Sequence, residues 1–334
     1  WANEGYVEGT FYDAYAYFVS IEKKFTDHHS FSFTAFNSPT KRGMQGTATD
    51  EANDLVGSNF YNPNWGYQNG EKRNSRIRYQ DQPTFILNHY WTINDKTTLT
   101  SNLGYSFGTY QTTALNWNNA QDPRPDYYRK LPSYRNTSDQ DVIGQLTDAW
   151  KNDVNTQQID WNSLYQTNYR SDTSTTYILE NRITDSKQLS FSSVLNWDFK
   201  SNLKMASGIE LSMYKGRNYK SIYDLLGGNY WVDIDQFAER DYGNGSDMVQ
   251  NDLDHPNKQV KKGDTFGYDY DANVNNGTLW SVANYMTNRV DYYFGANYVM
   301  TQFWRTGNMK NGRFPLNSKG DSEKETYNNF GVKG

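Results

Sequence analysis

The feature that most constrains this chain is a set of segments in which apolar and polar residues alternate with a period of two. In the clearest case, Leu, Phe, Trp and Phe share one face between Leu189 and Phe199, while Ser, Asn and Asp occupy the other. A turn at 200–202 follows, and the segment from Leu203 to Met213 alternates in the same way. Successive side chains of a strand point to opposite faces of a sheet, so this pattern predicts an antiparallel hairpin with one apolar face and one polar face.

Hairpins of this kind recur along the whole chain, and the connections between strands alternate in length. Within each hairpin the turn is about two to four residues, the usual length for such turns. Between hairpins the segments are far longer than the ~12–15 residues expected of structureless loops, so we expect them to be functional or internally folded. The predicted hairpins are about 12–39, 84–113, 188–214 and 278–304, and the predicted long loops are about 40–83, 114–187, 215–277 and 305–326.

One long loop also carries a helical signal. Val142, Leu146 and Trp150 recur at intervals of four after Ser138, a residue type that often caps a helix N-terminus. A second short helical turn is indicated at Trp161, Leu164 and Tyr165. We therefore expect this loop to carry its own small helices.

Composition removes several classes of protein. No stretch approaches the ~18 apolar residues that a membrane-spanning helix needs. The chain has no cysteine, which excludes a disulfide scaffold and thiol chemistry. Its 334 residues carry a net charge of −5 with no basic block, so we expect no nucleic-acid partner. It is only 36% hydrophobic yet 16% aromatic, which suits strands that need a single apolar face.

Short turns at one end and long loops at the other are typical of bacterial outer-membrane barrels. The alternating segments have about the 9–11 residues with which a tilted strand crosses the hydrocarbon layer. Aromatic residues near both ends of the segments match the two membrane interfaces. A soluble β-sandwich also alternates, but its strands are joined by short connections at both ends. The sequence therefore favours an all-β fold, an antiparallel transmembrane β-barrel with long extracellular loops.

Several strings, most of them in the long loops, point to a particular family. These strings are Ala35-Phe36-Asn37-Ser38-Pro39-Thr40-Lys41-Arg42-Gly43, Asn62-Pro63-Asn64-Trp65-Gly66-Tyr67, Asn74-Ser75-Arg76, Tyr177-Ile178-Leu179-Glu180-Asn181-Arg182, Asp224-Leu225-Leu226-Gly227-Gly228 and Phe303-Trp304-Arg305-Thr306-Gly307-Asn308. With them the chain resembles the β-barrel portion of TonB-dependent outer-membrane receptors, in particular those of the Bacteroidetes type.

The resemblance implies a 22-stranded barrel closed by an N-terminal plug domain. Residues 1–334 would then be part of one barrel domain, supplying about eight strands and the start of a ninth as a curved, open sheet. We expect the chain to be a fragment of a longer protein, with the plug and the TonB box outside it. The implied location is the bacterial outer membrane. The implied partners are outer-membrane lipid, the TonB complex through segments outside this chain, and a small nutrient ligand.

Aromatic residues of the long loops are the best candidates for ligand contacts. They lie among Asn, Asp, Gln and Arg, and flat aromatic faces beside amides and carboxylates suit polar ligands. The alternative is that these aromatics pack the loops onto each other. The ligand-binding candidates are Trp65, Tyr67, Trp117, Trp161, Tyr230 and Trp231.

Other constellations carry little chemistry. The adjacent His28 and His29 lie in a predicted turn and are expected to point apart, so we interpret them as polar turn residues. The stretch from Asp269 to Asn273 resembles a calcium loop but lacks its glycine and its bidentate glutamate, which favours a hydrated acidic loop. Catalytic and nucleotide-binding motifs are absent from the sequence. We predict no enzyme activity, no cofactor and no metal site.

The leading hypothesis is a receptor that takes up a scarce nutrient by TonB-dependent transport. The cargo, whether a siderophore, cobalamin, a glycan or a peptide, is not resolved by the sequence. One alternative is a passive porin-like channel of the outer membrane. A second is a secreted glycan-binding or adhesin β-domain, whose apolar face would be internal.

Overall fold

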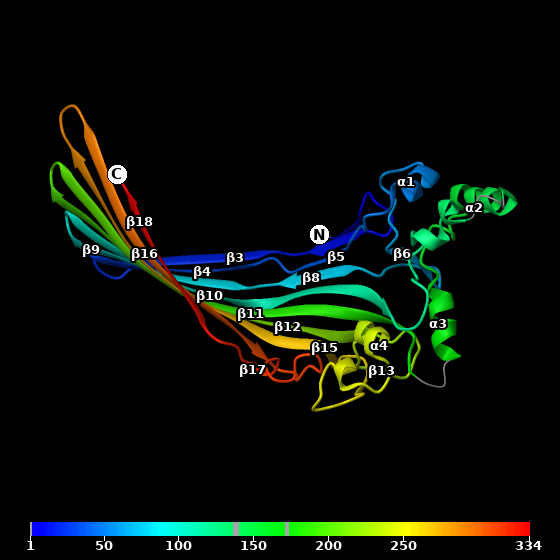
Figure 1. The fold of residues 1–334 in the computed structure, drawn as a ribbon. Coiled ribbons are helices and arrows are strands. Elements are labelled where there is room, and N and C mark those ends of the chain that lie inside the picture. The colour runs from blue at the N-terminus through cyan, green and yellow to red at the C-terminus, as the bar shows by residue number, and fades with distance from the viewer. Residues whose placement is uncertain (1, 136–139, 171–173) are drawn as a thin grey trace.

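The computed structural model describes residues 2–135, 140–170 and 174–334. Its main feature is one antiparallel sheet of 14 strands, long and curved, with the short turns at one end and the loops at the other (Figure 1). The strands of this sheet are β1 (Ala2–Glu4), β2 (Phe11–Ala14), β3 (Tyr17–Lys24), β4 (His29–Asn37), β5 (Thr40–Gly43), β8 (Ile77–Asp81), β9 (Thr84–Asn94), β10 (Thr97–Trp117), β11 (Tyr177–Lys200), β12 (Leu203–Asp224), β15 (Thr265–Met286), β16 (Asp291–Gly307), β17 (Gly320–Asp321) and β18 (Glu325–Lys333).

Each long strand pairs with its neighbour in the chain, as a meander does. Near the N-terminus the strands are divided: β2 pairs β5, which pairs β8, and β3 pairs β4, which pairs β9. Thus β2–β3, β4–β5 and β8–β9 are three long strands, each interrupted once. Two of the gaps contain Pro39 and Pro83, and proline cannot donate a hydrogen bond to a sheet ladder. β10 passes the same level unbroken, with Gly108 at φ 144°.

The structure extends several strands beyond their expected bounds at the long-loop end. β11 begins at Tyr177, β12 continues to Asp224 and β15 begins at Thr265, so the predicted loops 114–187 and 215–277 are too long. The predicted loop 40–83 also contains β5 and β8. The interpretation of 269–273 as a calcium loop or a hydrated loop is wrong, because these residues lie inside β15.

The two faces of the sheet differ in chemistry along its whole width. Phe33, Leu87, Leu103, Phe191 and Leu211 lie side by side on neighbouring strands, and we call their side the apolar face. Leu103 is 44% exposed and Leu211 is 47% exposed, so this face is not covered by the described residues. An uncovered apolar surface of this width requires an apolar surrounding.

The opposite side is the polar face. Ser32, Asn88, Asn102, Ser192 and Glu210 form the row that lies directly behind the apolar one. Their side chains join neighbouring strands: Asn88 donates to Ser32 at 2.8 Å and Asn102 donates to Ser192 at 3.0 Å. Cross-strand hydrogen bonds of this kind stabilise a sheet whose polar side faces water.

The apolar band ends abruptly toward the long loops. In β11 it runs from Leu189 to Phe199, about the 9–11 residues that cross a hydrocarbon layer. Beyond Met213 the same side of β12 carries ion pairs instead, from Lys215 to Asp271 at 2.9 Å and from Arg217 to Asp269 at 2.6 Å. The strands therefore continue well past the apolar band into a charged zone.

All helices lie at the long-loop end, opposite the short turns (Figure 1). The helices expected around 142–150 and 161–165 are confirmed, while the expected cap Ser138 lies outside the described residues. None of the described helices is both long and apolar enough to cross a membrane. The remaining elements are α1 (Asp50–Val56), β6 (Trp65–Gln68), β7 (Glu71–Asn74), η1 (Tyr128–Lys130), η2 (Pro132–Tyr134), α2 (Gln140–Asn152), α3 (Trp161–Tyr169), β13 (Trp231–Val232), α4 (Gln236–Tyr242), η3 (Asp247–Val249) and β14 (Gln259–Val260).

The loops pack against the end of β11 from both sides. Tyr177 and Leu179 belong to one buried cluster with Ile159, Trp161, Leu164 and Leu226. Between them, Ile178 points the other way and joins Ile222, Trp231, Val260 and Phe266. Both sides of this strand end are buried, so consecutive residues are apolar and do not alternate with polar ones. For that reason the pattern of alternation did not predict that β11 begins as early as Tyr177.

We predict that Gly66→Ala loosens the contact between β6 and the loop segment around Ile159. The backbone of Ile159 donates to Trp65 O at 2.9 Å, and a Cβ on Gly66 would lie 2.1 Å from Ile159 O. Relieving that overlap should cost about 1–3 kcal/mol of docking free energy. Limited proteolysis of the purified protein should then cut the loop faster than in the wild type.

Gly144→Ala is the matched control, because nothing lies within 4 Å of a Cβ at that position in α2. If both variants were cut at the wild-type rate, Gly66 would not be required for the docking of this loop.

Candidate functional site

Three of the six aromatic candidates are buried in the packing of the loops. Trp65 is 6% exposed, Trp161 0% and Trp231 4%. Trp161 and Trp231 belong to the two clusters around β11, and the Arg73 guanidinium lies 4.3 Å from the Trp161 ring centre. In this conformation these three indoles hold the loops together and present no open face to a ligand.

The other three candidates keep part of their surface exposed. Tyr67 is 47% exposed beside Trp65, and Tyr230 is half-buried next to β13. Trp117 ends β10, is half-buried, and lines the largest cavity at the long-loop end. Of the six, only Trp117 lines this cavity.

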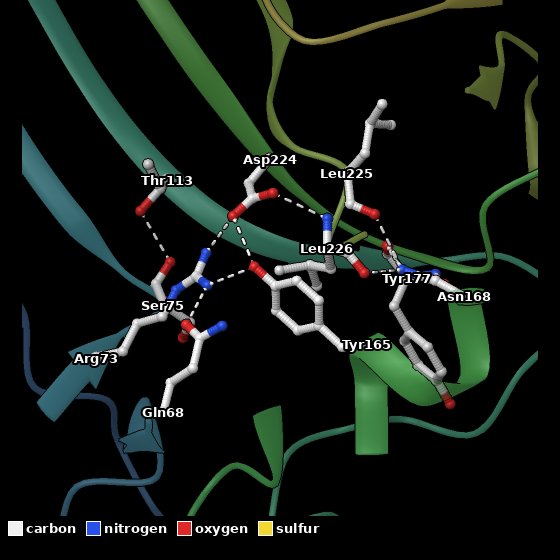
Figure 2. A network of polar contacts seen from close by, with 10 residues as sticks. All are labelled: Gln68, Arg73, Ser75, Thr113, Tyr165, Asn168, Tyr177, Asp224, Leu225 and Leu226. Atoms are coloured by element: carbon white, nitrogen blue, oxygen red, sulfur yellow. Dashed lines mark hydrogen bonds and ion pairs between the residues drawn. The ribbon is translucent and has the colours of Figure 1, made fainter. Parts of the chain in front are cut away.

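A network of polar contacts, which we call the polar clamp, joins three loops at the long-loop end of the sheet (Figure 2). Arg73 of β7 forms a 2.6 Å ion pair with Asp224, at the end of β12. The Tyr165 hydroxyl of α3 accepts from Arg73 at 3.1 Å and donates to Asp224 at 3.4 Å. Arg73 and Asp224 are both partly buried, so this contact is screened less by water than a surface pair.

Asn168 is the second fixed point of the clamp. Its amide donates to the backbone carbonyls of Tyr177, Leu225 and Leu226 at 2.8, 3.0 and 3.0 Å. Its carbonyl accepts from the backbone N–H groups of Thr176 and Tyr177 at 3.1 and 3.0 Å. Because Asn168 is only 2% exposed, one side chain satisfies backbone groups that water does not reach.

The largest cavity is a cleft of about 1380 Å³ between the ends of β10–β12 and the overlying loops. Asn116, Glu180, Arg182 and Lys220 form its strand side, and the alternation places them on the polar face of the sheet. We call this cavity the cationic cleft. Its walls are Leu115, Asn116, Trp117, Asn118, Asn119, Ala120, Gln121, Asp122, Pro125, Tyr127, Arg129, Lys130, Tyr134, Arg135, Leu146, Trp150, Thr156, Glu180, Arg182, Lys220, Gln236, Phe237 and Arg240.

Glu180 is the buried acid at the base of this cleft. It is 0% exposed, accepts from Arg182 at 2.7 Å and from Lys220 at 3.0 Å, and also accepts from Asn116 at 2.8 Å. A buried carboxylate is stable only when paired and hydrogen-bonded in this way. Glu180 therefore holds the ends of three strands together.

Burial also shifts the pKa of groups in the loop wall. Burial lowers the pKa of the Lys130 amine, against the nearby charges of Asp122 and Asp126. Burial raises the pKa of Asp126 in the same loop. Asp122 forms a 2.5 Å ion pair with Arg124, which neutralises the charge of the Asp122 carboxylate.

A second hollow lies on the polar face nearer the middle of the sheet. It measures about 600 Å³, and its polar lining includes Asn88, Asn102, Ser190, Ser192 and Glu210. Asn88, Asn102, Ser192 and Glu210 also belong to the row of the polar face whose side chains join neighbouring strands. The polar face is therefore hollowed along the strands, with the cationic cleft over its long-loop end.

The histidines do not come together in a metal centre. His28 Nδ1 lies 2.8 Å from Thr92 O, whereas His29 Nδ1 lies 3.0 Å from His89 Nε2, so the adjacent pair points to different partners. Within the described residues no group of three or more His, Cys, Asp or Glu is arranged to hold a metal ion.

Sequence reasoning did not select Glu180, Arg182 and Lys220, which form the base of the cleft. One signal was present: Glu180 follows directly after the apolar residues Tyr177, Ile178 and Leu179, and an acid buried beside such residues requires a partner. Lys220, the partner, is 40 residues away in the chain, and only the register of β11 and β12 brings it close.

No protein-family model and no curated protein sequence matches this chain. Solved structures do share its fold. The copper transporter OprC is 7% identical, with a TM-score of 0.50 over 97% of this chain. The siderophore receptor PiuA from Acinetobacter baumannii is 12% identical, with a TM-score of 0.50 over 99%. The open form of the ferric-catecholate import receptor Fiu from E. coli K12 is 8% identical, with a TM-score of 0.50 over 99%.

The chain spans 34%, 40% and 45% of the lengths of OprC, PiuA and Fiu. At these identities the likeness concerns the fold alone. The fold class expected from the sequence is confirmed: the chain is mostly strand, and its large antiparallel sheet is similar to the β-barrels of these solved structures.

We predict that Asn168→Leu destabilises the clamp. Leucine has nearly the same shape but leaves three carbonyls and two N–H groups without their partner, and each buried unsatisfied group costs about 1–3 kcal/mol. Hydrogen exchange should become faster at Thr176, Tyr177 and Leu226 than in the wild type.

Asn152→Leu is the control, since the Asn152 side chain bonds only within its own exposed helix turn, to Asp148 at 2.7 Å. Unchanged exchange at Tyr177 in the Asn168 variant would show that the clamp does not depend on this amide.

Proposed function

We propose that this chain is part of the barrel of a TonB-dependent outer-membrane receptor of the Bacteroidetes type, which imports a small nutrient. The observation that carries the proposal is the pairing of an uncovered apolar face with a hollowed polar face in one curved sheet. The rest of the barrel, the plug and the TonB-binding segment would lie in parts of the protein outside these residues. No catalytic step is part of the proposal.

The apolar face supports a place in the outer membrane. The side chains at its centre, Leu103 and Leu211, are nearly half-exposed, and such a surface would aggregate in water. Its limits also fit, because the ion pairs of Lys215 and Arg217 begin where the band ends. Lipid would cover the apolar band, and the charged zone would stand in water outside the membrane.

The polar face supports a route for a polar ligand. The cationic cleft lies over its long-loop end, and the 600 Å³ hollow lies further along the same face. In a closed barrel this face would line the lumen. Loops held by the clamp would capture the ligand outside, and the plug would gate its passage.

Neither alternative accounts for both faces. A secreted adhesin domain would bury its apolar face within a sandwich, whereas the central leucines here remain exposed. A passive porin requires an open lumen, and the porin hypothesis does not explain why long, folded loops cover the polar face at one end.

We predict that Leu211→Arg abolishes membrane assembly while Ser212→Arg is tolerated. The two residues are adjacent in β12 but lie on opposite faces. Arginine at the centre of a lipid-facing band costs about 2–4 kcal/mol, whereas arginine on a wet face costs little. Outer-membrane fractionation of cells that produce each full-length variant measures the difference. Equal amounts of both variants in the membrane fraction would contradict the assignment of the faces.

The transport proposal has its own test. Uptake of a labelled nutrient by cells that depend on this protein should require an intact TonB complex and a proton-motive force. Loss of uptake on deletion of TonB is the expected result. Uptake that continues unchanged without TonB would favour the porin-like channel.

A further inference from the structure

We propose that the cationic cleft binds a small anion that carries several carboxylate or phosphate groups. The proposal rests on the proposed function, because it names the class of cargo that such a receptor would capture. It follows from how charge is distributed within the cleft.

The acids of the cleft are already neutralised. Glu180 is paired with Arg182 and Lys220, and Asp122 is paired with Arg124. These carboxylates are 0% and 7% exposed, so they do not act as free acceptors for a cationic ligand. A cleft with this distribution of charge disfavours the binding of cations. In the part of the chain that the structure describes, its other basic side chains have no acidic partner within the cleft.

Three basic side chains in the wall have no such partner. Arg129, Lys130 and Arg135 have no carboxylate within 4.0 Å among the described residues. All three come from a short segment, which η1 and η2 fold against the cleft. Burial of Lys130 without a contacting counter-charge penalises its ammonium form, and an anion bound beside it would remove that penalty.

The neighbouring groups hold one of these cations in place. Arg129 donates to the Tyr128 hydroxyl at 2.9 Å, and its guanidinium lies 5.6 Å and 5.9 Å from the ring centres of Tyr128 and Tyr134. A guanidinium fixed between rings is pre-organised, so little entropy is lost when it pairs with an oxyanion. The planar fork then suits two oxygens of one carboxylate or phosphate.

This local charge is not a consequence of a basic chain. The chain has a net charge of −5, yet six of the eight charged side chains in the wall of the cleft are cationic. Concentration of one sign in a cleft focuses the field and speeds the capture of ions of the other sign. Glu180, Arg182 and Lys220 belong to the polar face, and the cleft lies beyond the end of the apolar band, so the anion would come from water and not from membrane lipid.

The cleft has room and polar groups for a small organic anion. Its volume of about 1380 Å³ exceeds the usual range of small-molecule sites, ~300–1,000 Å³, so such an anion would fill only part of it. Asn118, Asn119 and Gln121 add side-chain amides to the wall of the cleft, whereas the amides of Asn116 and Gln236 are already hydrogen-bonded to each other at 3.1 Å. Amides donate and accept, so they would bind the hydroxyl or carbonyl groups that such an anion carries.

Titration of the full-length protein in detergent tests the proposal, with inorganic pyrophosphate and tricarballylate as probes. We expect saturable binding of both anions, weakened by added salt because exposed charges are screened. Arg129→Gln, Lys130→Gln and Arg135→Gln should each raise Kd about tenfold, since each variant removes a charge-assisted hydrogen bond to the anion.

Lys262→Gln is the charge-matched control, because Lys262 is exposed and lies outside the cleft. Its Kd should equal that of the wild type. Arg135 is exposed, so its variant keeps the test informative if Lys130→Gln does not fold.

The proposal is overturned if neither anion binds, if the three variants bind as tightly as Lys262→Gln, or if neutral maltotriose binds in preference to both anions. Binding in detergent needs neither lipid nor TonB. Failure here together with intact TonB-dependent uptake would therefore overturn only the class of cargo, whereas anion binding without such uptake would overturn only the transport function.

Discussion

The structure depends on one constraint: the apolar face of the sheet has no protein layer over it among the described residues. Neighbouring strands place large apolar side chains on that side, in rows such as Phe33, Leu87, Leu103, Phe191 and Leu211. A soluble protein would cover them with a second layer. Here the loops that might form such a layer lie instead at one end, so the apolar band stays open over a length that matches a hydrocarbon layer.

Beyond the band the architecture changes from one layer to three. The ends of β10, β11 and β12 lie between loops on both sides, with Leu179 buried on one side and Ile178 on the other. In this part of the structure, buried polar side chains such as Glu180 and Asn168 hold the strand ends and the loops together. In the proposed receptor the same strands would face lipid along one half, and they support the loops along the other.

The change from an uncovered sheet to strand ends covered by loops explains which parts of the fold could be predicted from the sequence. Where one face meets an apolar medium and the other meets water, residues alternate, and the hairpins were predicted from alternation alone. Where both faces are covered, as from Tyr177 to Ile183, alternation disappears and the strand was mistaken for loop. The helices α2 and α3 were predictable because one side of each is apolar at helical spacing.

The candidate site was only partly predictable for a related reason. Loop aromatics serve two purposes, and the sequence does not separate Trp161, which packs the clamp, from Trp117, which lines the cleft. The cleft itself is assembled from segments far apart in the chain, since Arg129, Glu180 and Lys220 meet only through strand register and loop docking. Charges that look scattered in an acidic sequence therefore become a local cationic surface once the acids are paired off. That pairing, more than the number of basic residues, determines which ligands the cleft attracts.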